Sequence, residues 1–90
     1  MNHKYQVKIK NKVLKKLPKL PELVQTKLAL LLLDLQNTGP IQPQWQNYSR
    51  LGNEKYHCHL GRSWVACWEN KNNQLVIEVY YVGSRENAPY

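Results

Sequence analysis

The chain begins with an alternation of apolar and polar residues. Tyr5, Val7 and Ile9 are separated by glutamine and lysine residues, and this period of two predicts a first strand with one apolar face. Asn11 then occupies the position of a helix N-cap, and a short apolar stripe follows it. We expect this first helix to end at Pro18, because a proline disfavours helical geometry in the residue before it.

A second and much more apolar helix is predicted from Pro21 to about Asn37. Proline suits the first turn, where its missing N–H would have no partner, and Gly39-Pro40 closes the helix. The principal apolar face consists of residues at helical spacing, namely Leu20, Val24, Leu28, Leu31 and Leu35. Four further leucines widen this face, namely Leu23, Leu30, Leu32 and Leu33. A helix this apolar is either a broad core helix or one that also presents a face to a partner.

The second half of the chain is expected to contain one loop and three strands. Residues 38–54, rich in Gly, Pro, Gln and Asn, predict a loop held down by Trp45, Tyr48 and Leu51. Strands are predicted at 55–61, 64–70 and 75–83, with hairpin turns at 61–63 and 71–74. The expected fold is therefore α+β, one domain over residues 1–90. Two N-terminal helices pack on one face of a mostly antiparallel four-stranded sheet, in the order β-α-α-β-β-β.

Alternation along the strand at 55–61 separates two histidines from the core. Tyr56, Cys58 and Leu60 point toward the helices, so His57 and His59 belong on the open face of the sheet. Because Cys58 then faces away from both histidines, the three side chains cannot converge on one zinc ion. We expect no metal site and no cofactor, and both cysteines of the chain are expected to be small core residues.

The open face is also expected to carry Arg62 at a turn, Arg85 after the last strand and Tyr90 in the tail. Cleavage of RNA through its own 2′-hydroxyl requires a base, an acid for the leaving oxygen and cations for the phosphate. Histidine exchanges protons near neutral pH, arginine binds phosphate, and tyrosine either stacks on a base or transfers a proton. These residues can supply all three roles; the alternative is a solvated basic face without chemistry.

The charge of the chain limits the class of its partners. Among 90 residues there are 13 Lys+Arg and 6 Asp+Glu, and the formal net charge of +7 favours a polyanion or an acidic protein as partner. The longest apolar run, 28–33, is far shorter than the ~20 residues of a membrane-spanning helix, so no membrane association is expected. The N-terminus contains no apolar signal core and the cysteines are too few for a disulfide scaffold, so we expect a reduced, cytoplasmic protein.

Three stretches of the sequence, together with the element order, resemble the RelE/ParE superfamily of type II toxin–antitoxin toxins. They are RLGNEKYHCHL (50–60), WVACWE (64–69) and IEVYYVGSRENAPY (77–90), of which VGSRE followed by Tyr90 is the most specific. The resemblance spans essentially the whole chain and favours the RelE-like branch. It implies a compact toxin that a cognate antitoxin neutralises. RelE-like members cut mRNA in the ribosomal A site, whereas ParE-like members poison DNA gyrase.

The resemblance also implies roles for individual residues. His57 and His59 stand where RelE-like toxins usually carry two lysines, and Arg85 and Tyr90 match an arginine and a late tyrosine of the family. Catalysis is therefore expected of these four residues. Phosphate binding is expected of Arg85 and of Arg62, which lies just before the strand that carries a further arginine in the family.

The sequence therefore predicts a toxin that inhibits translation as a metal-independent, ribosome-dependent mRNA endoribonuclease. The alternatives are a gyrase inhibitor without nuclease activity and a non-toxic basic RNA-binding module. The expected partners are mRNA on the ribosome and an acidic antitoxin. We expect the antitoxin to cover exposed apolar surface of the second helix at Leu23, Leu30 and Leu33, with Lys27 steering its approach.

Overall fold

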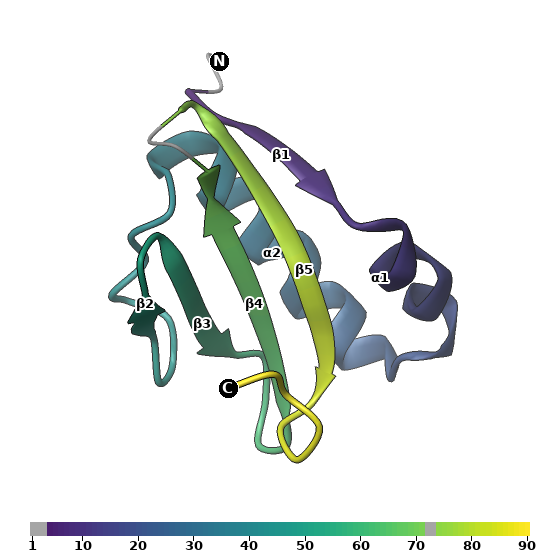
Figure 1. Ribbon diagram of the computed structural model, residues 1–90. Coiled ribbons are helices and arrows are strands. Elements are labelled where there is room, and N and C mark those ends of the chain that lie inside the picture. The colour runs from purple at the N-terminus through teal and green to yellow at the C-terminus, as the bar shows by residue number, and fades with distance from the viewer. Residues whose placement is uncertain (1–3, 72–73) are drawn as a thin grey trace.

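The computed structural model describes residues 4–71 and 74–90 (Figure 1). Five strands, two α-helices and one turn of 3-10 helix follow one another along the chain. They are β1 (Gln6–Ile9), α1 (Asn11–Lys16), η1 (Leu17–Lys19), α2 (Glu22–Thr38), β2 (Ser49–Gly52), β3 (Lys55–His59), β4 (Trp64–Asn70) and β5 (Val76–Ser84). The predicted helices and four predicted strands are confirmed to within a few residues, and the turn predicted at 71–74 lies partly outside the described residues.

The sheet differs from the prediction in the number and direction of its strands. It has five strands in the order β1-β5-β4-β3-β2, and β1 runs parallel to β5 while all other pairs are antiparallel. The expected number of four strands is therefore wrong, whereas the sheet is mostly antiparallel as expected, with one parallel pair. The additional strand, β2, lies inside the predicted loop. Its residues are exposed except for the half-buried Leu51, so it has no apolar face that alternation could reveal.

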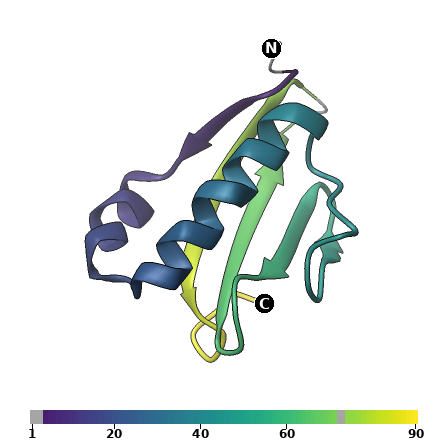
Figure 2. The ribbon, with the colours of Figure 1, turned by 180° about the vertical axis from the view of Figure 1, so that it is seen from behind.

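Helix α2 covers one face of the sheet and lies obliquely over β4 and β5 (Figure 2). Its 17 residues correspond to about 26 Å at ~1.5 Å per residue, which is enough to cross several strands. Helix α1 has six residues, or about 9 Å, and lies beside β1 and β5 at the edge of the sheet. The expectation that both helices pack on one face is therefore correct for α2, while α1 contributes only Val13 to the same core from the edge of the sheet. Within the described parts of the chain, no helix is long and apolar enough to span a lipid bilayer.

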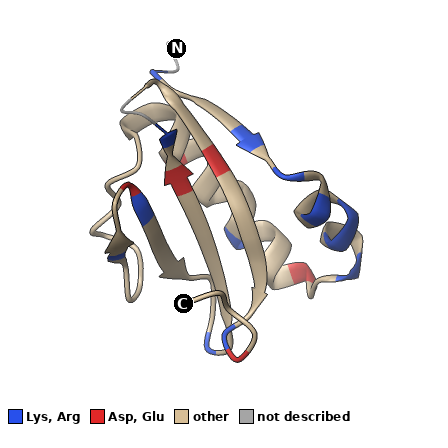
Figure 3. Cartoon of the chain, viewed as in Figure 1, with Lys and Arg blue, Asp and Glu red and all other residues tan. Residues whose placement is uncertain are grey.

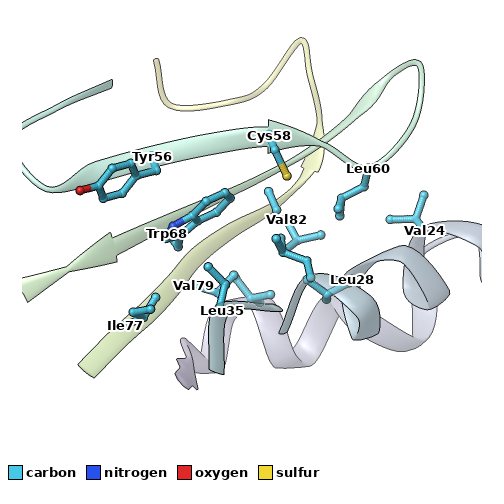
Figure 4. Close-up of a cluster of buried hydrophobic side chains, with 13 residues drawn as sticks. Val24, Leu28, Leu35, Tyr56, Cys58, Leu60, Trp68, Ile77, Val79 and Val82 are labelled. Carbon is cyan, nitrogen blue, oxygen red and sulfur yellow. The ribbon is translucent and has the colours of Figure 1, made fainter. Parts of the chain in front are cut away.

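The hydrophobic core lies between α2 and the sheet (Figure 4). Of the predicted helix face, Val24, Leu28, Leu31 and Leu35 are buried as expected, whereas Leu20 precedes α2 and is half-buried. The face packs against the predicted strand residues Tyr56, Cys58 and Leu60. Trp68 is the largest fully buried side chain, and its indole N–H donates a hydrogen bond to the Pro40 carbonyl at 3.0 Å. Rings of Tyr48, Tyr56 and Trp68 stack with centroids 6.2–6.3 Å apart, which extends the core toward β2.

The ends of the helices differ from those that the sequence predicted. The N-cap of α1 is Lys10, without a side-chain hydrogen bond, so Asn11 is the first helical residue and not the cap. Pro18 lies within the 3-10 turn that follows α1. Gly39 closes α2 with φ at 93°, and a Cβ there would lie 2.6 Å from the Tyr5 ring. A glycine is therefore required where the start of the sheet meets the end of α2.

The loop after α2 is held down by side chains, as the sequence predicted. The Trp45 indole N–H donates to the Asp34 carboxylate at 2.8 Å, which ties the loop back to α2. The fully buried amide of Gln42 donates to the carbonyls of Gly39 and Asp34 at 2.8 and 3.1 Å. This loop ends at Asn47, whose φ of 53° places it in the left-handed region that asparagine tolerates. The loop therefore positions Asn47 beside the end of β3.

We predict that Leu31→Ala lowers the free energy of unfolding by about 2–5 kcal/mol, because the side chain is fully buried and its loss leaves a cavity. Leu30→Ala is the matched control, since this neighbouring leucine is 51% exposed; its expected effect is within about 1 kcal/mol. Urea unfolding of the two variants and the wild type measures both changes. Equal losses in the two variants would contradict the described helix orientation.

Candidate active site

Strand register sets which side chains share the face opposite α2. In β3, Cys58 belongs to the helix-side core, so His57 and His59 face the other way, and their partners on β4 are Cys67 and Val65. The predicted register is therefore confirmed. Cys67 is buried as predicted, but it lies beneath the histidines and not in the core with Cys58. Burial raises the pKa of Cys67 to about 12, so its thiol stays protonated at neutral pH.

The two histidines are buried and not solvated, which corrects the expectation of an open face. His57 is 7% exposed and His59 is 8% exposed. The Ser49 hydroxyl on β2 lies 2.9 Å from Nδ1 of His57. The Asn47 side-chain nitrogen lies 3.4 Å from Nδ1 of His59. The loop and strand that precede β3 thus orient both rings.

The C-terminal tail covers the same two rings. The Tyr90 ring lies 4.5 Å from the His57 ring at an angle of 49°, and the His57 and His59 rings are 5.8 Å apart. Tyr90 itself remains 54% exposed, so one side of its ring is open to solvent. The last strand therefore returns the end of the chain to β3, as the yellow tail in Figure 1 shows.

The two arginines that the sequence singled out differ in their positions. Arg85 directly follows β5, and its backbone N–H donates to the Ser63 carbonyl at 2.8 Å, which holds the tail against the β3–β4 turn. The positive charge of its guanidinium acts to lower the pKa of both His59 and Tyr90. Arg62 is exposed in the same turn, and no described contact joins its side chain to the histidines. We call His57, His59, Arg85 and Tyr90 the histidine site.

The environment of the histidine site favours neutral rings. Burial lowers the pKa of His57, and the charge of His59 lowers it further, while the contact with Ser49 opposes the change. Burial also lowers the pKa of His59, with the Arg85 guanidinium adding to the effect. For Tyr90, burial raises the pKa of the hydroxyl and Arg85 opposes it. At neutral pH both imidazoles can accept a proton and the phenol can donate one.

A β-bulge in β5 adds two tyrosines that the sequence analysis did not assign to this face. The register of β4 with β5 shifts between Cys67 and Trp68, whose partners are Tyr81 and Val79. Val79 and Val82 both belong to the helix-side core, so Tyr80 and Tyr81 between them lie on the opposite face. The doublet of tyrosines between two valines is the signal in the sequence, because a regular strand would alternate.

A row of charged residues crosses the far end of this face. Cross-strand pairs join Lys55 with Glu69, Glu69 with Glu78, and Glu78 with Lys8. Two like charges face each other in the middle of this charge row, which is destabilising unless cations neutralise them, and the Lys71 ammonium lies 3.4 Å from the Glu78 carboxylate. Figure 3 shows these acidic residues on β4 and β5, away from the tail, and a concentration of basic residues on β1 and α1.

The residues expected to contact an antitoxin lie on the outer side of α2. Leu23, Leu30 and Leu33 are exposed large hydrophobic side chains, and Lys27 is exposed between them. No group of three or more His, Cys, Asp and Glu side chains that could hold a metal ion is found among residues 4–71 and 74–90. The His57-Cys58-His59 cluster does not converge, because Cys58 lies on the opposite side of β3.

The depressed pKa values of the histidines predict a loss of stability in mild acid. Between the folded-state pKa and the ordinary value near 6.5, the unfolded chain binds more protons than the folded chain does. The free energy of unfolding therefore falls as pH falls through this window, by about 1.4 kcal/mol for each unit by which a pKa is lowered. Urea midpoints measured from neutral pH down to about pH 5 test this linkage.

The control is the double variant His57→Gln, His59→Gln. It lacks both titrating rings, so its midpoint is expected to depend less on pH over the same window. A wild-type midpoint that stays constant, or two proteins with identical pH dependence, would refute the assignment of this linkage to the histidine pair.

The chain matches known proteins by its structure but not by its sequence. No protein-family model and no curated protein matches the chain by sequence. Solved structures do match. A chain of the archaeal RelE–RelB complex from Pyrococcus horikoshii superposes with a TM-score of 0.73 at 19% identity, over 94% of this chain and 99% of that one.

Two structures from E. coli agree with this result. The isolated RelE toxin gives a TM-score of 0.72 at 21% identity, covering 94% of this chain and 88% of that one. A chain of the DinJ–YafQ toxin–antitoxin complex gives 0.73 at 12% identity, covering 97% and 99%. The chain therefore shares the fold of the RelE toxin, as the resemblance of its sequence implied.

Proposed function

We propose that this chain is the toxin of a type II toxin–antitoxin system, and that it cleaves ribosome-bound mRNA without a metal ion. The observation that carries the proposal is the meeting of the two histidines, Arg85 and Tyr90, which come from segments far apart in the sequence. The RelE-like fold supports the same function. The net charge of +7 suits a polyanionic substrate.

In the proposed reaction a neutral imidazole of the pair accepts the proton of an RNA 2′-hydroxyl. The 2′-oxygen attacks the adjacent phosphorus, and the bond from phosphorus to the 5′-oxygen of the next nucleotide breaks. Because burial and neighbouring positive charge lower the pKa of both histidines, the base is already neutral at neutral pH. Lysines in these positions would need a strongly depressed pKa to act in this way.

The two other residues of the histidine site complete the reaction. Tyr90 keeps its proton at neutral pH and can transfer it to the leaving 5′-oxygen, or it can stack on the base beside the cleaved bond. Arg85 is exposed and carries a permanent charge, so it can bind the phosphate oxygens on which negative charge builds up. Arg62, in the turn that Arg85 contacts, is proposed to bind a phosphate of the same strand.

Access to the histidines requires contact with the tail. The rings are 7–8% exposed, and Tyr90 covers His57 while leaving about half of its own surface open. We propose that the substrate first stacks on Tyr90 and that movement of the tail then admits the scissile phosphate. The alternatives, a gyrase inhibitor and a basic RNA-binding module, need no access to either ring.

The proposed partner is an acidic antitoxin. The RelE–RelB and DinJ–YafQ complexes each contain a chain with the same fold as this one. That likeness supports a neutralising partner for this chain. The exposed leucines of α2 offer apolar surface for an extended or helical segment, and Lys27 adds positive charge among them. This surface lies on the far side of the sheet from the histidine site, so the two contacts do not compete for the same residues.

We predict that His57→Gln or His59→Gln lowers the rate of mRNA cleavage and removes the acid limb of its pH profile. A residue acting as general base contributes typically 100–10,000-fold to the rate. For the wild type, the rate falls as pH drops below the lowered histidine pKa, because the protonated ring no longer accepts the 2′-hydroxyl proton. Single-turnover cleavage of mRNA on ribosomes across pH, with mapped mRNA ends, is the measurement.

Two arginine variants complete this experiment: Arg85→Ala lies in the histidine site, and Arg50→Ala is the control outside it. Arg85→Ala should lose roughly 100–1,000-fold in rate while keeping the acid limb. Arg50→Ala should keep the wild-type rate, because Arg50 lies on β2 with its guanidinium 5.7 Å from the Tyr56 ring. Glutamine variants that keep wild-type rates and the same acid limb would exclude a catalytic role for the pair. Intact mRNA together with inhibited gyrase would establish the gyrase alternative instead.

Charge reversal at Lys27 is predicted to slow association with the proposed acidic antitoxin. Complementary charge mainly steers the encounter, so Lys27→Glu should lower the association rate severalfold at low salt and have little effect at high salt. Leu30→Ser should instead raise the dissociation rate, since it removes contact area. Surface-based kinetic binding measures both rates, and Lys19→Glu on η1 is the charge-matched control. An association rate independent of salt would refute the electrostatic steering.

A further inference from the structure

A groove of about 350 Å³ lies between α1 and the C-terminal tail, beside β5. Neither histidine lines it, so it is separate from the histidine site. One wall is formed by α1 and the residue before it, and the other by Asn87 and Pro89 of the tail. The tail continues to Tyr90, which contacts His57. The groove therefore adjoins the site through the same tail segment.

The walls of the groove are strongly basic. Lys10, Lys12 and Lys16 all line it, and no carboxylate occurs among its described lining residues. Lys12 and Lys16 are four residues apart in α1, which places them on the same side of the helix, where their like charges repel. Lys15 and Lys19 belong to the same segment but do not line the groove. An anion bound in the groove would relieve the repulsion between its lysines.

Tyr80 and Tyr81 of the bulge both line the groove, but the Tyr80 ring lies beside Lys55 of β3, with the ammonium 5.9 Å from its centre, so Tyr81 is the aromatic ring that faces the lysines of α1. The Tyr81 hydroxyl donates to the Ser84 carbonyl at 2.7 Å, which fixes its ring. This position depends on Gly83, because a Cβ there would lie 2.8 Å from the Tyr81 hydroxyl. The Lys16 ammonium lies 5.8 Å from the centre of the same ring. Lysines beside fixed aromatic rings are the combination with which proteins bind single-stranded nucleic acid.

We propose that this groove binds the part of the RNA strand that flanks the nucleotide held at the histidine site, with the lysines on its phosphates and Tyr81 stacked on a base. The proposal rests on the proposed function for the identity of the strand. β5 and β3 are separated only by β4, or two strand spacings of about 4.8 Å, a distance that neighbouring nucleotides of one strand bridge. At the other end of the face, the charge row pairs Glu69 and Glu78 with Lys55 and Lys8, so it offers a phosphate backbone no excess of positive charge.

The test is the salt dependence of binding to a short fluorescent 2′-O-methyl oligoribonucleotide, which has no 2′-hydroxyl to react. For single strands, each phosphate contact contributes about 0.7 to the slope of log affinity against log salt. The double variant Lys12→Gln, Lys16→Gln should therefore reduce the slope by about 1.4, and Lys16→Gln alone by about 0.7. The pair Lys15→Gln, Lys19→Gln removes the same charge outside the groove and should reduce the slope by less than half as much.

Stacking is tested with Tyr81→Leu, which should weaken binding of the oligoribonucleotide about tenfold and leave binding of an abasic strand of equal length unchanged. Equal slopes for the two lysine pairs, or equal effects of Tyr81→Leu on both strands, would overturn the proposal. Because binding is measured without cleavage, the groove and the nuclease can fail separately. A wild type that binds as expected but leaves mRNA intact refutes the nuclease only, and one that cleaves mRNA while both lysine pairs behave alike refutes the groove only.

Discussion

The alternation of side chains along β3 is the constraint on which the proposed activity depends. Cys58 is enclosed on the helix side together with Trp68 and the buried leucines of α2, so its neighbours His57 and His59 must point to the opposite face. A shift of one residue in the register of β3 would bring both histidines into an apolar core and expose Tyr56. Every buried side chain of the strand would add to the free-energy cost of such a shift. Core packing, more than any bond within the histidine site, therefore determines which residues face a substrate.

Elements with strong apolar periodicity could be predicted from the sequence, and elements defined by backbone pairing could not. Leu28 and Leu31 in α2 and Tyr56 in β3 follow helical and strand periods, and all are buried as expected. β2 exists because its backbone pairs with β3, and its exposed residues carry no period. The parallel pairing of β1 with β5 joins the two ends of the chain, and hydrophobic alternation contains no information on strand direction.

For the histidine site, the residue types were predictable but their environment was not. Alternation placed His57 and His59 on the correct face, and the resemblance to RelE-like toxins pointed to Arg85 and Tyr90. Their burial arises from contacts over long sequence separations, from Asn47 in the preceding loop and from the returning tail. Such contacts lower the pKa of the rings, so the electrostatic property most relevant to a general base follows from tertiary structure alone.

The positions of the charged residues on this face matter more for binding than the net charge of the face. The charge row combines Lys8 and Lys55 with Glu69 and Glu78, so it is nearly neutral, while α1 carries lysines without acidic residues in its first turn. Screening at physiological salt limits these fields to about 8 Å, whereas the molecule extends over 25–30 Å. The basic patch at α1 and the nearly neutral charge row therefore act over separate parts of the face. If the proposed RNA strand binds, this arrangement aligns it along the tail and α1 more than it attracts it to the whole molecule.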